Sequence, residues 1–442
     1  MKPVGILIAC ALAAGAASNN TVLIRGADVY PVTSAPVKGA SILVVDGKIA
    51  ELGVKVVAPK GARVVDGKGL RVYPGMIDSG TELGLSEIEA IRETVDTGEL
   101  GEFMPQLRAL ASVNSDSEHF AVVRIAGITS VVTLPAGDGG GGRPGAARQY
   151  ISGQAALIHT FGWTWEDMAV SGPAAVYVRF PTLGPPAERG GPMPENIAGL
   201  AGMTGAATLT QMMRTYQQEV TKLAEFFEEA RRYQKAKAAH LPGLVRDLKY
   251  ESMLPVLERK LPVAVAASTP RAIHDAIQFA DQQNVKIVIM QPREFGSAAA
   301  ELKAKNIPVI LGKVLALPRG HDDPYDQAFT LPAEAYKAGI KFAFGTFENQ
   351  FVRNLPYQAA TAVAFGLPQD EALKAITINS AQIWGAGDQL GSIEQGKSAD
   401  LMVTTGDPLE IQTQIKHVFI RGRETELSSK QTRLYERYVS RQ

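Results

Sequence analysis

The chain of 442 residues contains a single cysteine, Cys10, and only six histidines. Cys10 lies in the apolar N-terminal segment, so removal of that segment leaves no thiol for disulfide bonds, metal ligation or nucleophilic catalysis. No two histidines have the HxH or HExxH spacing that is typical of metal sites. The scarcity of these two residue types therefore excludes thiol chemistry and leaves no recognisable histidine pair for a metal ion.

The sequence also lacks an excess of charge and a long apolar run. Its 45 Lys and Arg residues balance 45 Asp and Glu residues, so no overall field favours nucleic acid or an anionic membrane. After residue 20 there is no stretch of the roughly 20 apolar residues that a transmembrane helix requires. We therefore predict small molecules or proteins as ligands, and no nucleic-acid partner.

Residues 1–18 have the pattern of a secretory signal peptide, because Lys2 precedes an apolar run from Pro3 to Ala14 and small residues follow. We predict that this segment is cleaved and that the protein is exported, to the periplasm or outside the cell. Leu7 to Cys10 also matches a bacterial lipobox, which would leave a lipid anchor. The short apolar run before Cys10 favours ordinary cleavage, so we expect membrane attachment only if Cys10 is lipidated.

Both ends of the chain carry β-strand patterns. Short alternating runs with Asp-Gly turns fill residues 21–52, and further β-rich runs occur at 399–404 and 417–421. We predict that residues 19–75 and 388–427 together form one small composite β-sandwich. Residues 428–442 would follow as a C-terminal tail.

Between these ends, short apolar runs alternate with amphipathic helical stretches, which favours parallel βα units and an α/β class. Residues 76–387 are long enough for one (β/α)8 barrel whose own ends lie close together. A long helical stripe predicts a helical insertion near residues 205–240. The predicted strands are Ser130 to Leu134, Ala175 to Val178, Val263 to Ala266, Lys286 to Met290, Val309 to Leu311 and Phe342 to Phe344.

Several motifs resemble the amidohydrolase superfamily, in a branch close to imidazolonepropionases. The segment Val72 to Leu83, VYPGMIDSGTEL, resembles the first-strand signature PG-[LMI]-ID-x-H-x-H, and the segments from Arg353 to Asn379 and Gly391 to Leu401 resemble the C-terminal third. The resemblance implies a distorted TIM barrel, (β/α)8, with a β-sandwich built from both termini. It also implies hydrolysis of non-peptide C–N bonds, in amides or cyclic amides, by water activated on zinc or another divalent metal.

The residues at the implied metal-ligand positions cannot bind a catalytic metal ion. The first-strand His pair is replaced by Gly80 and Glu82, the fifth-strand His by Ala266, the sixth-strand His by Gln291 and the eighth-strand Asp by Phe347. Only Glu82 offers a good oxygen ligand, whereas a catalytic zinc site normally keeps three protein ligands. We therefore expect no metal cofactor. The fourth-strand position stays open, since Arg179 is the only polar residue near it.

Four residues remain as candidates for catalysis without that metal: Asp78, Glu82, His321 and Glu348. The carboxylates could form an acid–base cluster if burial raised one pKa. His321 lies on an acidic loop that should reach the same face, although a solvated loop is the simpler interpretation. The favoured hypothesis is a pseudo-amidohydrolase that binds a small molecule in the barrel mouth or pairs with an active paralogue or another copy of itself. The alternative is an active C–N hydrolase with an atypical or metal-free carboxylate site.

Overall fold

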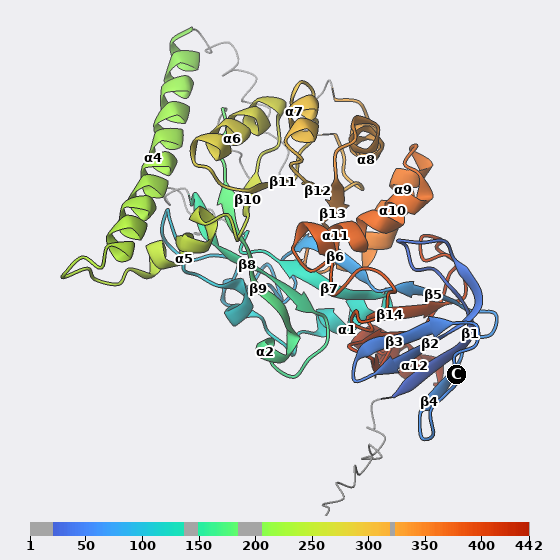
Figure 1. Cartoon of the computed structure of the whole chain (residues 1–442). Coiled ribbons are helices and arrows are strands. Elements are labelled where there is room, and N and C mark those ends of the chain that lie inside the picture. The colour runs from blue at the N-terminus through green and yellow to red at the C-terminus, as the bar shows by residue number, and fades with distance from the viewer. Residues whose placement is uncertain (1–20, 137–148, 184–205, 319–322, 442) are drawn as a thin grey trace, which may run out of the picture.

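The computed structural model describes residues 21–136, 149–183, 206–318 and 323–441. Two sheets organise these residues, one built from both ends of the chain and one from its middle (Figure 1). The predicted signal segment, including Cys10, lies outside the described residues. Among the residues that are described, no helix has the length and apolar character to cross a membrane.

The terminal sheet has the strand order β16-β15-β14-β5-β1-β2-β3, and β4 pairs with β1. At one edge of this sheet, β2 pairs antiparallel with β3. These two strands form the hairpin that the Asp46-Gly47 turn predicts. Strand β14 from the C-terminal part then pairs antiparallel with β5 from the N-terminal part. The predicted β domain from both chain ends is therefore confirmed. The strands are β1 (Val22–Val29), β2 (Val37–Val45), β3 (Lys48–Gly53), β4 (Arg63–Asp66), β5 (Arg71–Pro74), β14 (Leu401–Thr404), β15 (Ile415–Ile420) and β16 (Arg423–Thr425).

The second sheet has the order β13-β12-β11-β10-β9-β8-β7-β6 and curls into a nearly closed barrel. The amide of Phe347, just after β13, donates to the carbonyl of Gly80 in β6 at 2.7 Å, which joins the two edge strands. The predicted barrel is thus confirmed. Its strands are β6 (Met76–Thr81), β7 (Ile128–Thr133), β8 (Ile151–His159), β9 (Ala169–Arg179), β10 (Val263–Ala266), β11 (Ile287–Met290), β12 (Val309–Leu311) and β13 (Phe342–Phe344).

One strand departs from the predicted parallel pattern. Strand β8 runs antiparallel to both β7 and β9 and is absent from the strands predicted from the sequence. Only nine residues separate the end of β8 from β9, and they hold the four-residue helix α2 (Trp165–Met168). A parallel connection needs a crossover of a dozen or more residues, so this short link produces a hairpin. The barrel sheet is therefore mixed.

Helices cover the outer face of the barrel (Figure 1). The predicted helical insertion corresponds to α4, the longest helix, which stands at one side of the molecule with α5. The α-helices are α1 (Glu118–Ile125), α2 (Trp165–Met168), α4 (Ala206–Ala238), α5 (Leu248–Leu257), α6 (Pro270–Gln282), α7 (Ala298–Ala304), α8 (Gln327–Ala338), α9 (Leu355–Ala364), α10 (Gln369–Ala375), α11 (Ile378–Ile383) and α12 (Lys430–Val439), and the short 3-10 helices are Arg92–Thr94, Ala109–Ser112 and Val352–Asn354.

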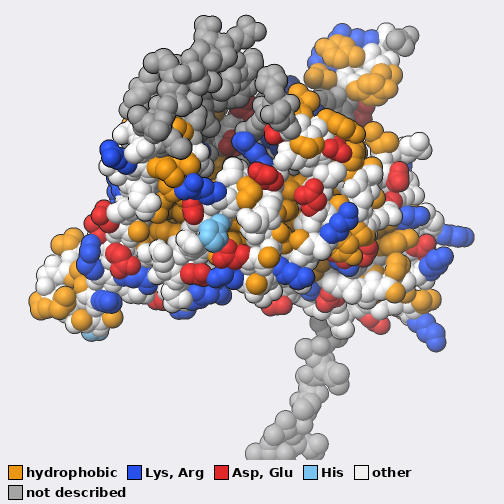
Figure 2. Space-filling view, turned by 90° about the horizontal axis from the view of Figure 1, so that it is seen from above, with side chains coloured by type: hydrophobic (Ala, Val, Ile, Leu, Met, Phe, Trp, Pro, Cys, Tyr) orange, Lys and Arg blue, Asp and Glu red, His pale blue; other side chains and the backbone are white. Residues whose placement is uncertain are grey.

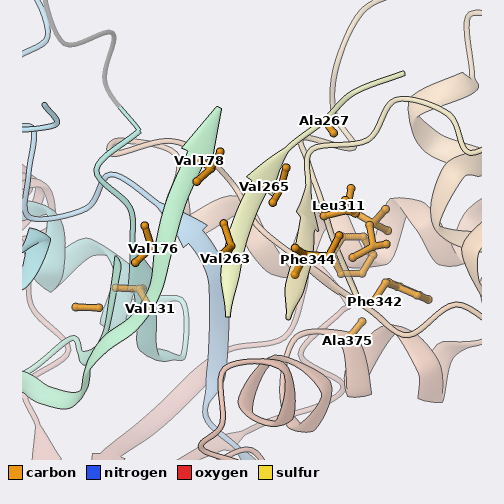
Figure 3. Close-up of a cluster of buried hydrophobic side chains, with 14 of the residues drawn as sticks. Val131, Val176, Val178, Val263, Val265, Ala267, Leu311, Phe342, Phe344 and Ala375 are labelled. Atoms are coloured by element: carbon orange, nitrogen blue, oxygen red, sulfur yellow. The ribbon is translucent and has the colours of Figure 1, made fainter. Parts of the chain in front are cut away.

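Alternate residues of the barrel strands face two different cores. In Figure 3, the pairs Val176 and Val178 of β9 and Val263 and Val265 of β10 belong to the core between sheet and helices. The residues between them in sequence, such as Tyr177 and Ala264, fill the barrel interior. This period of two is what a strand buried on both faces requires. It leaves the carboxyl ends of the strands as the open end of the barrel.

Candidate functional site

A cavity of about 520 Å3 lies at the carboxyl ends of the barrel strands. Residues at the ends of β6, β9, β10, β11 and β12 line it, as the barrel fold predicts for a functional site. Its volume is within the range of about 300–1,000 Å3 that small-molecule sites occupy. The residues used in the argument below are Glu82, Arg179, Ala266, Gln291, Lys313 and Phe347.

The ring of Phe347 lies against Gly80 and closes the space at the first strand. A Cβ atom on Gly80 would lie 2.9 Å from both Cε1 and Cζ of this ring. A Cβ on Gly345 would likewise lie 2.8 Å from the ring atom Cε2. Both distances are too short for real carbon atoms, so two glycines provide the room that one phenyl ring occupies. The ring packs against the interior core of the barrel.

The fifth and sixth strands end in residues that place no metal ligand in the cavity. Ala266 is the last residue of β10, and Gln291 directly follows β11. Gln291 and Phe347 both have positive φ angles, of 55° and 50°, which non-glycine residues adopt rarely and chiefly where surrounding contacts hold them. The amides of both residues donate to carbonyls of a neighbouring strand, Gln291 to Ile310 and Phe347 to Gly80. The turns at these strand ends are thus firmly positioned.

Asp78 is fully buried beneath this site and does not line the cavity. Its Oδ1 accepts hydrogen bonds from the amides of Gly80 and Thr346 at 3.0 and 3.1 Å, and its Oδ2 accepts one from the Thr346 hydroxyl at 2.6 Å. Burial raises the pKa of Asp78 to about 7, although the three hydrogen bonds oppose that shift. Asp78 therefore ties β6 to the segment after β13.

The backbones of Glu82 and Glu348 are joined next to the cavity. The amide of Glu82 donates to the carbonyl of Glu348 at 3.1 Å, and the carboxylate of Glu348 forms an ion pair with Lys313. Glu82 lines the cavity, and so does Lys313. The third candidate, His321, lies outside the described residues. The structure thus brings two of the four predicted catalytic residues together at the surface and places Asp78 below them.

Three cationic side chains at the cavity are prominent in the structure: Arg179, Arg293 and Lys313. The guanidinium of Arg179 donates to the carbonyl of Ala136, across the end of the barrel. From the sequence, Arg179 was predicted only as a polar residue near the fourth-strand position, and Arg293 and Lys313 were not predicted at all. Their positions, within three residues after the ends of β11 and β12, are the signal that could have identified them.

Comparisons with known proteins agree with the barrel fold described above. A family model, the amidohydrolase family, matches residues 126–425. This chain belongs to the amidohydrolase family. An amidohydrolase from Thermotoga maritima has the same fold with a TM-score of 0.75 and 27% identity, over 92% of this chain and 99% of that one.

Two imidazolonepropionases share sequence with this chain over shorter stretches. The protein from Mesorhizobium japonicum is 29% identical over 148 residues, which are 32% of this chain and 34% of that protein. The protein from Syntrophobacter fumaroxidans is 33% identical over 129 residues, 25% of this chain and 30% of that protein. The matched region thus spans about a third of the length of these curated relatives.

The residues present do not fit the divalent metal that the family resemblance implies. Glycine, alanine and phenylalanine at positions 80, 266 and 347 have no donor atom, and glutamine at 291 has only an amide oxygen, a poor zinc ligand. Within the described ranges, no three His, Cys, Asp or Glu side chains come close enough together to hold a metal ion. We therefore derive no chemical step through a metal for this amidohydrolase.

Proposed function

We propose that this member of the amidohydrolase family is an exported pseudoenzyme, which keeps the barrel and its open cavity but not the metal-dependent hydrolysis of C–N bonds. The proposal rests chiefly on Phe347, whose ring fills the space next to Gly80 where the family resemblance places metal ligands. Hydroxide is expensive to generate without a metal, since binding lowers the pKa of water from about 15.7 to about 7. A phenyl ring supplies neither the metal site nor the general base.

The remaining cavity supports a role in binding a small molecule. Its interior is apolar, with Leu134, Met290 and Phe347 among its residues, and its rim carries cationic and anionic side chains. Such a combination of apolar walls and few polar groups is typical of ligand sites. A tight-fitting ligand should therefore stabilise the folded chain against heat. The variant Met290→Trp, which fills the cavity, should abolish that stabilisation, whereas Val57→Trp on the exposed surface should leave it intact.

Hydrolysis assays test the loss of activity directly. The purified chain should give no rate above background on a panel of acyclic and cyclic amides, and neither added zinc nor a chelator should change that result. A rate that zinc increases and a chelator removes would contradict the proposal. Export is tested separately, by finding the chain in the periplasmic or extracellular fraction and by mass analysis of its mature N-terminus.

A metal-free hydrolase is the second candidate, and the adjacency of Glu82 and Glu348 favours it. Glu82 lines the cavity, its backbone is joined to that of Glu348, and the Glu348 carboxylate pairs with the cavity residue Lys313. Carboxylates are among the groups that general acid–base catalysis uses. If this candidate is right, hydrolysis will be insensitive to chelators and will fall by about 100-fold or more in Glu82→Gln or Glu348→Gln. Asp78 is a weaker participant, because its carboxylate oxygens are buried and hydrogen-bonded.

A partner role is the other part of the proposal, with an active amidohydrolase paralogue or a second copy as the partner. Light scattering on the purified chain measures self-association. Co-purification with a tagged paralogue from the same organism measures the mixed assembly, and an increase in that paralogue's turnover would show what this chain contributes.

A further inference from the structure

Helices α4 and α5 form a helical arm, residues 206–257, beside the barrel. In Figure 1 the arm stands at the left edge, and its turn between the two helices is the leftmost point of the structure. Four large apolar side chains lie at this turn with 40% to 81% of their surface exposed. They are Leu241, Leu244, Val245 and Leu248. Figure 2 shows the resulting hydrophobic patch at the far left.

The arm is firmly packed, so this exposure does not reflect a loose segment. Phe226 and Phe227 of α4 are buried in the main core, and Phe226 stacks on Phe103 with 4.6 Å between ring centroids. Near the turn, the carboxylate of Glu251 accepts hydrogen bonds from Tyr233 and Lys237, both at 2.6 Å. The structure thus holds four apolar side chains in water on a rigid support.

Basic residues surround the apolar tip. Residues 228–251 contain six Lys and Arg and four Asp and Glu, a net charge of +2, in a chain whose formal net charge is zero. Arg231 and Arg232 pair with Glu228 and Glu229, which leaves Lys235, Lys237, Arg246 and Lys249 as the basic residues nearest the tip. Lys237 and Arg246 line a shallow groove of about 320 Å3 together with Tyr233, Leu244 and Glu251. An apolar tip next to a cluster of basic side chains is the pattern of a segment that enters the interface of an anionic membrane.

We propose that the tip of the helical arm docks onto an anionic lipid surface. The four apolar side chains enter the boundary between headgroups and acyl chains, and Lys235, Arg246 and Lys249 face the phosphates. This contact is independent of the proposed function of the barrel. From the sequence we expected membrane attachment only if Cys10 is lipidated, and the proposed contact at the tip is a different one. The net charge of the whole chain is zero, so it does not reveal the local positive charge at the tip.

Two features favour a lipid surface over a second copy of the chain. Two tips brought together would each contribute a net charge of +2 and would repel. The tip is also a convex turn, and four side chains bury far less than the roughly 800 Å2 per partner of a stable interface. Nucleic acid would use the basic residues but would leave the apolar side chains in water.

Co-sedimentation with vesicles tests the proposal on the full chain. Vesicles made of equal parts of phosphatidylglycerol and phosphatidylcholine should bind the protein, and added salt should weaken this binding. Vesicles of phosphatidylcholine alone should bind it much less. The variant Leu241→Ser/Val245→Ser/Leu248→Ser should lower the partition coefficient by about tenfold or more, since three apolar side chains leave the interface. Lys235→Glu/Arg246→Glu should lower binding to the anionic vesicles selectively. The matched control, Val54→Ser/Val57→Ser/Ile411→Ser, alters equally exposed apolar residues elsewhere and should bind as the native chain does.

A local reporter separates the tip from any contact made by the N-terminal segment. The chain has three native tryptophans, so the signal is the difference in emission between the variant and the native chain. That difference should shift to shorter wavelength in Val245→Trp on addition of anionic vesicles and be quenched by brominated acyl chains, whereas in Val57→Trp it should not. The proposal is overturned if this tip tryptophan is not quenched, or if the triple-serine variant partitions as the native chain does. It is equally overturned if the tip mutations abolish a dimer or binding to duplex DNA while binding to vesicles is unchanged.

Discussion

The phenyl ring of Phe347 occupies the space that a side chain on Gly80 would need. Gly80 lies in β6 and Phe347 follows β13, so the contact joins the first and last strands of the barrel sheet. The same two residues are linked by the hydrogen bond from the Phe347 amide to the Gly80 carbonyl. In the family resemblance both positions belong to metal ligands. The two substitutions therefore fit each other, since the missing side chain at 80 makes room for the ring at 347.

This fit predicts an energetic coupling between the two positions. Gly80→Ala should lower the free energy of unfolding by about 1–3 kcal/mol, because the new Cβ overlaps the ring. The same change in a Phe347→Ala background should cost less than about 1 kcal/mol, since the ring is absent and the remaining neighbour, Leu134 Cδ1 at 3.1 Å, is the end of a flexible side chain. Denaturant unfolding of the four proteins measures the difference.

Gly53→Ala is a matched control for this cycle. Gly53 also lies in a strand, and a Cβ there would meet only a Val56 methyl carbon at 3.7 Å, an ordinary contact. Its effect on stability should be small and should not depend on Phe347. Equal costs of Gly80→Ala in both backgrounds would show that the ring does not occupy the space beside Gly80.

Burial of Asp78 predicts that its ionisation destabilises the fold. Its pKa is raised from 3.8 to about 7, so the folded chain holds a proton that the unfolded chain has released. The stability contributed by this group is complete below about pH 4 and is lost as pH rises to about 7, with a slope of at most about 1.4 kcal/mol per pH unit. Asp78→Asn, which mimics the protonated acid, should remove this part of the pH dependence.

Thr346→Val provides a second measurement of the same group. The Thr346 hydroxyl donates to Asp78 and lowers its pKa, so loss of that hydroxyl should extend the decline in stability above pH 7. A pH profile that is the same in the native chain, Asp78→Asn and Thr346→Val would contradict a raised pKa at Asp78.

His159 predicts a pH dependence of opposite sign. Burial lowers its pKa from 6.5, although nearby Asp400 opposes the shift, and its Nδ1 lies 3.2 Å from the Ser130 hydroxyl. Below about pH 6.5 the unfolded chain binds a proton that the folded chain does not, so stability should fall as pH decreases. His159→Asn should flatten this acid limb in denaturant unfolding. An unchanged acid limb would mean that another group is responsible.

The sequence predicted the barrel and the terminal sheet because their signals are local. Apolar runs such as Val263–Ala266 and Val309–Leu311 coincide with β10 and β12, and buried parallel strands produce such runs. Strand β8 was missed, although its residues Ile151–His159 are buried, because periodicity alone does not reveal the direction of a strand. Its antiparallel course depends on a short connection that only the fold makes evident.

The site was predictable in its losses but less so in its contacts. The motif around Gly80 and the residues at 266, 291 and 347 showed from the sequence that the metal ligands are absent. That the ring of Phe347 reaches Gly80, and that Thr346 binds Asp78, depends on bringing together residues more than 260 positions apart in the chain. No sequence pattern indicates a contact between a glycine and a distant phenylalanine.

The metal content of the purified chain tests the central claim most directly. The native protein, incubated with excess zinc and then desalted, should retain well below one equivalent by mass spectrometry of the metal. The account predicts this because Gly80, Ala266 and Phe347 supply no ligand and the ring of Phe347 closes the space beside the first strand. Retention of a full equivalent of zinc, lost in Glu82→Gln or Gln291→Ala, would contradict it.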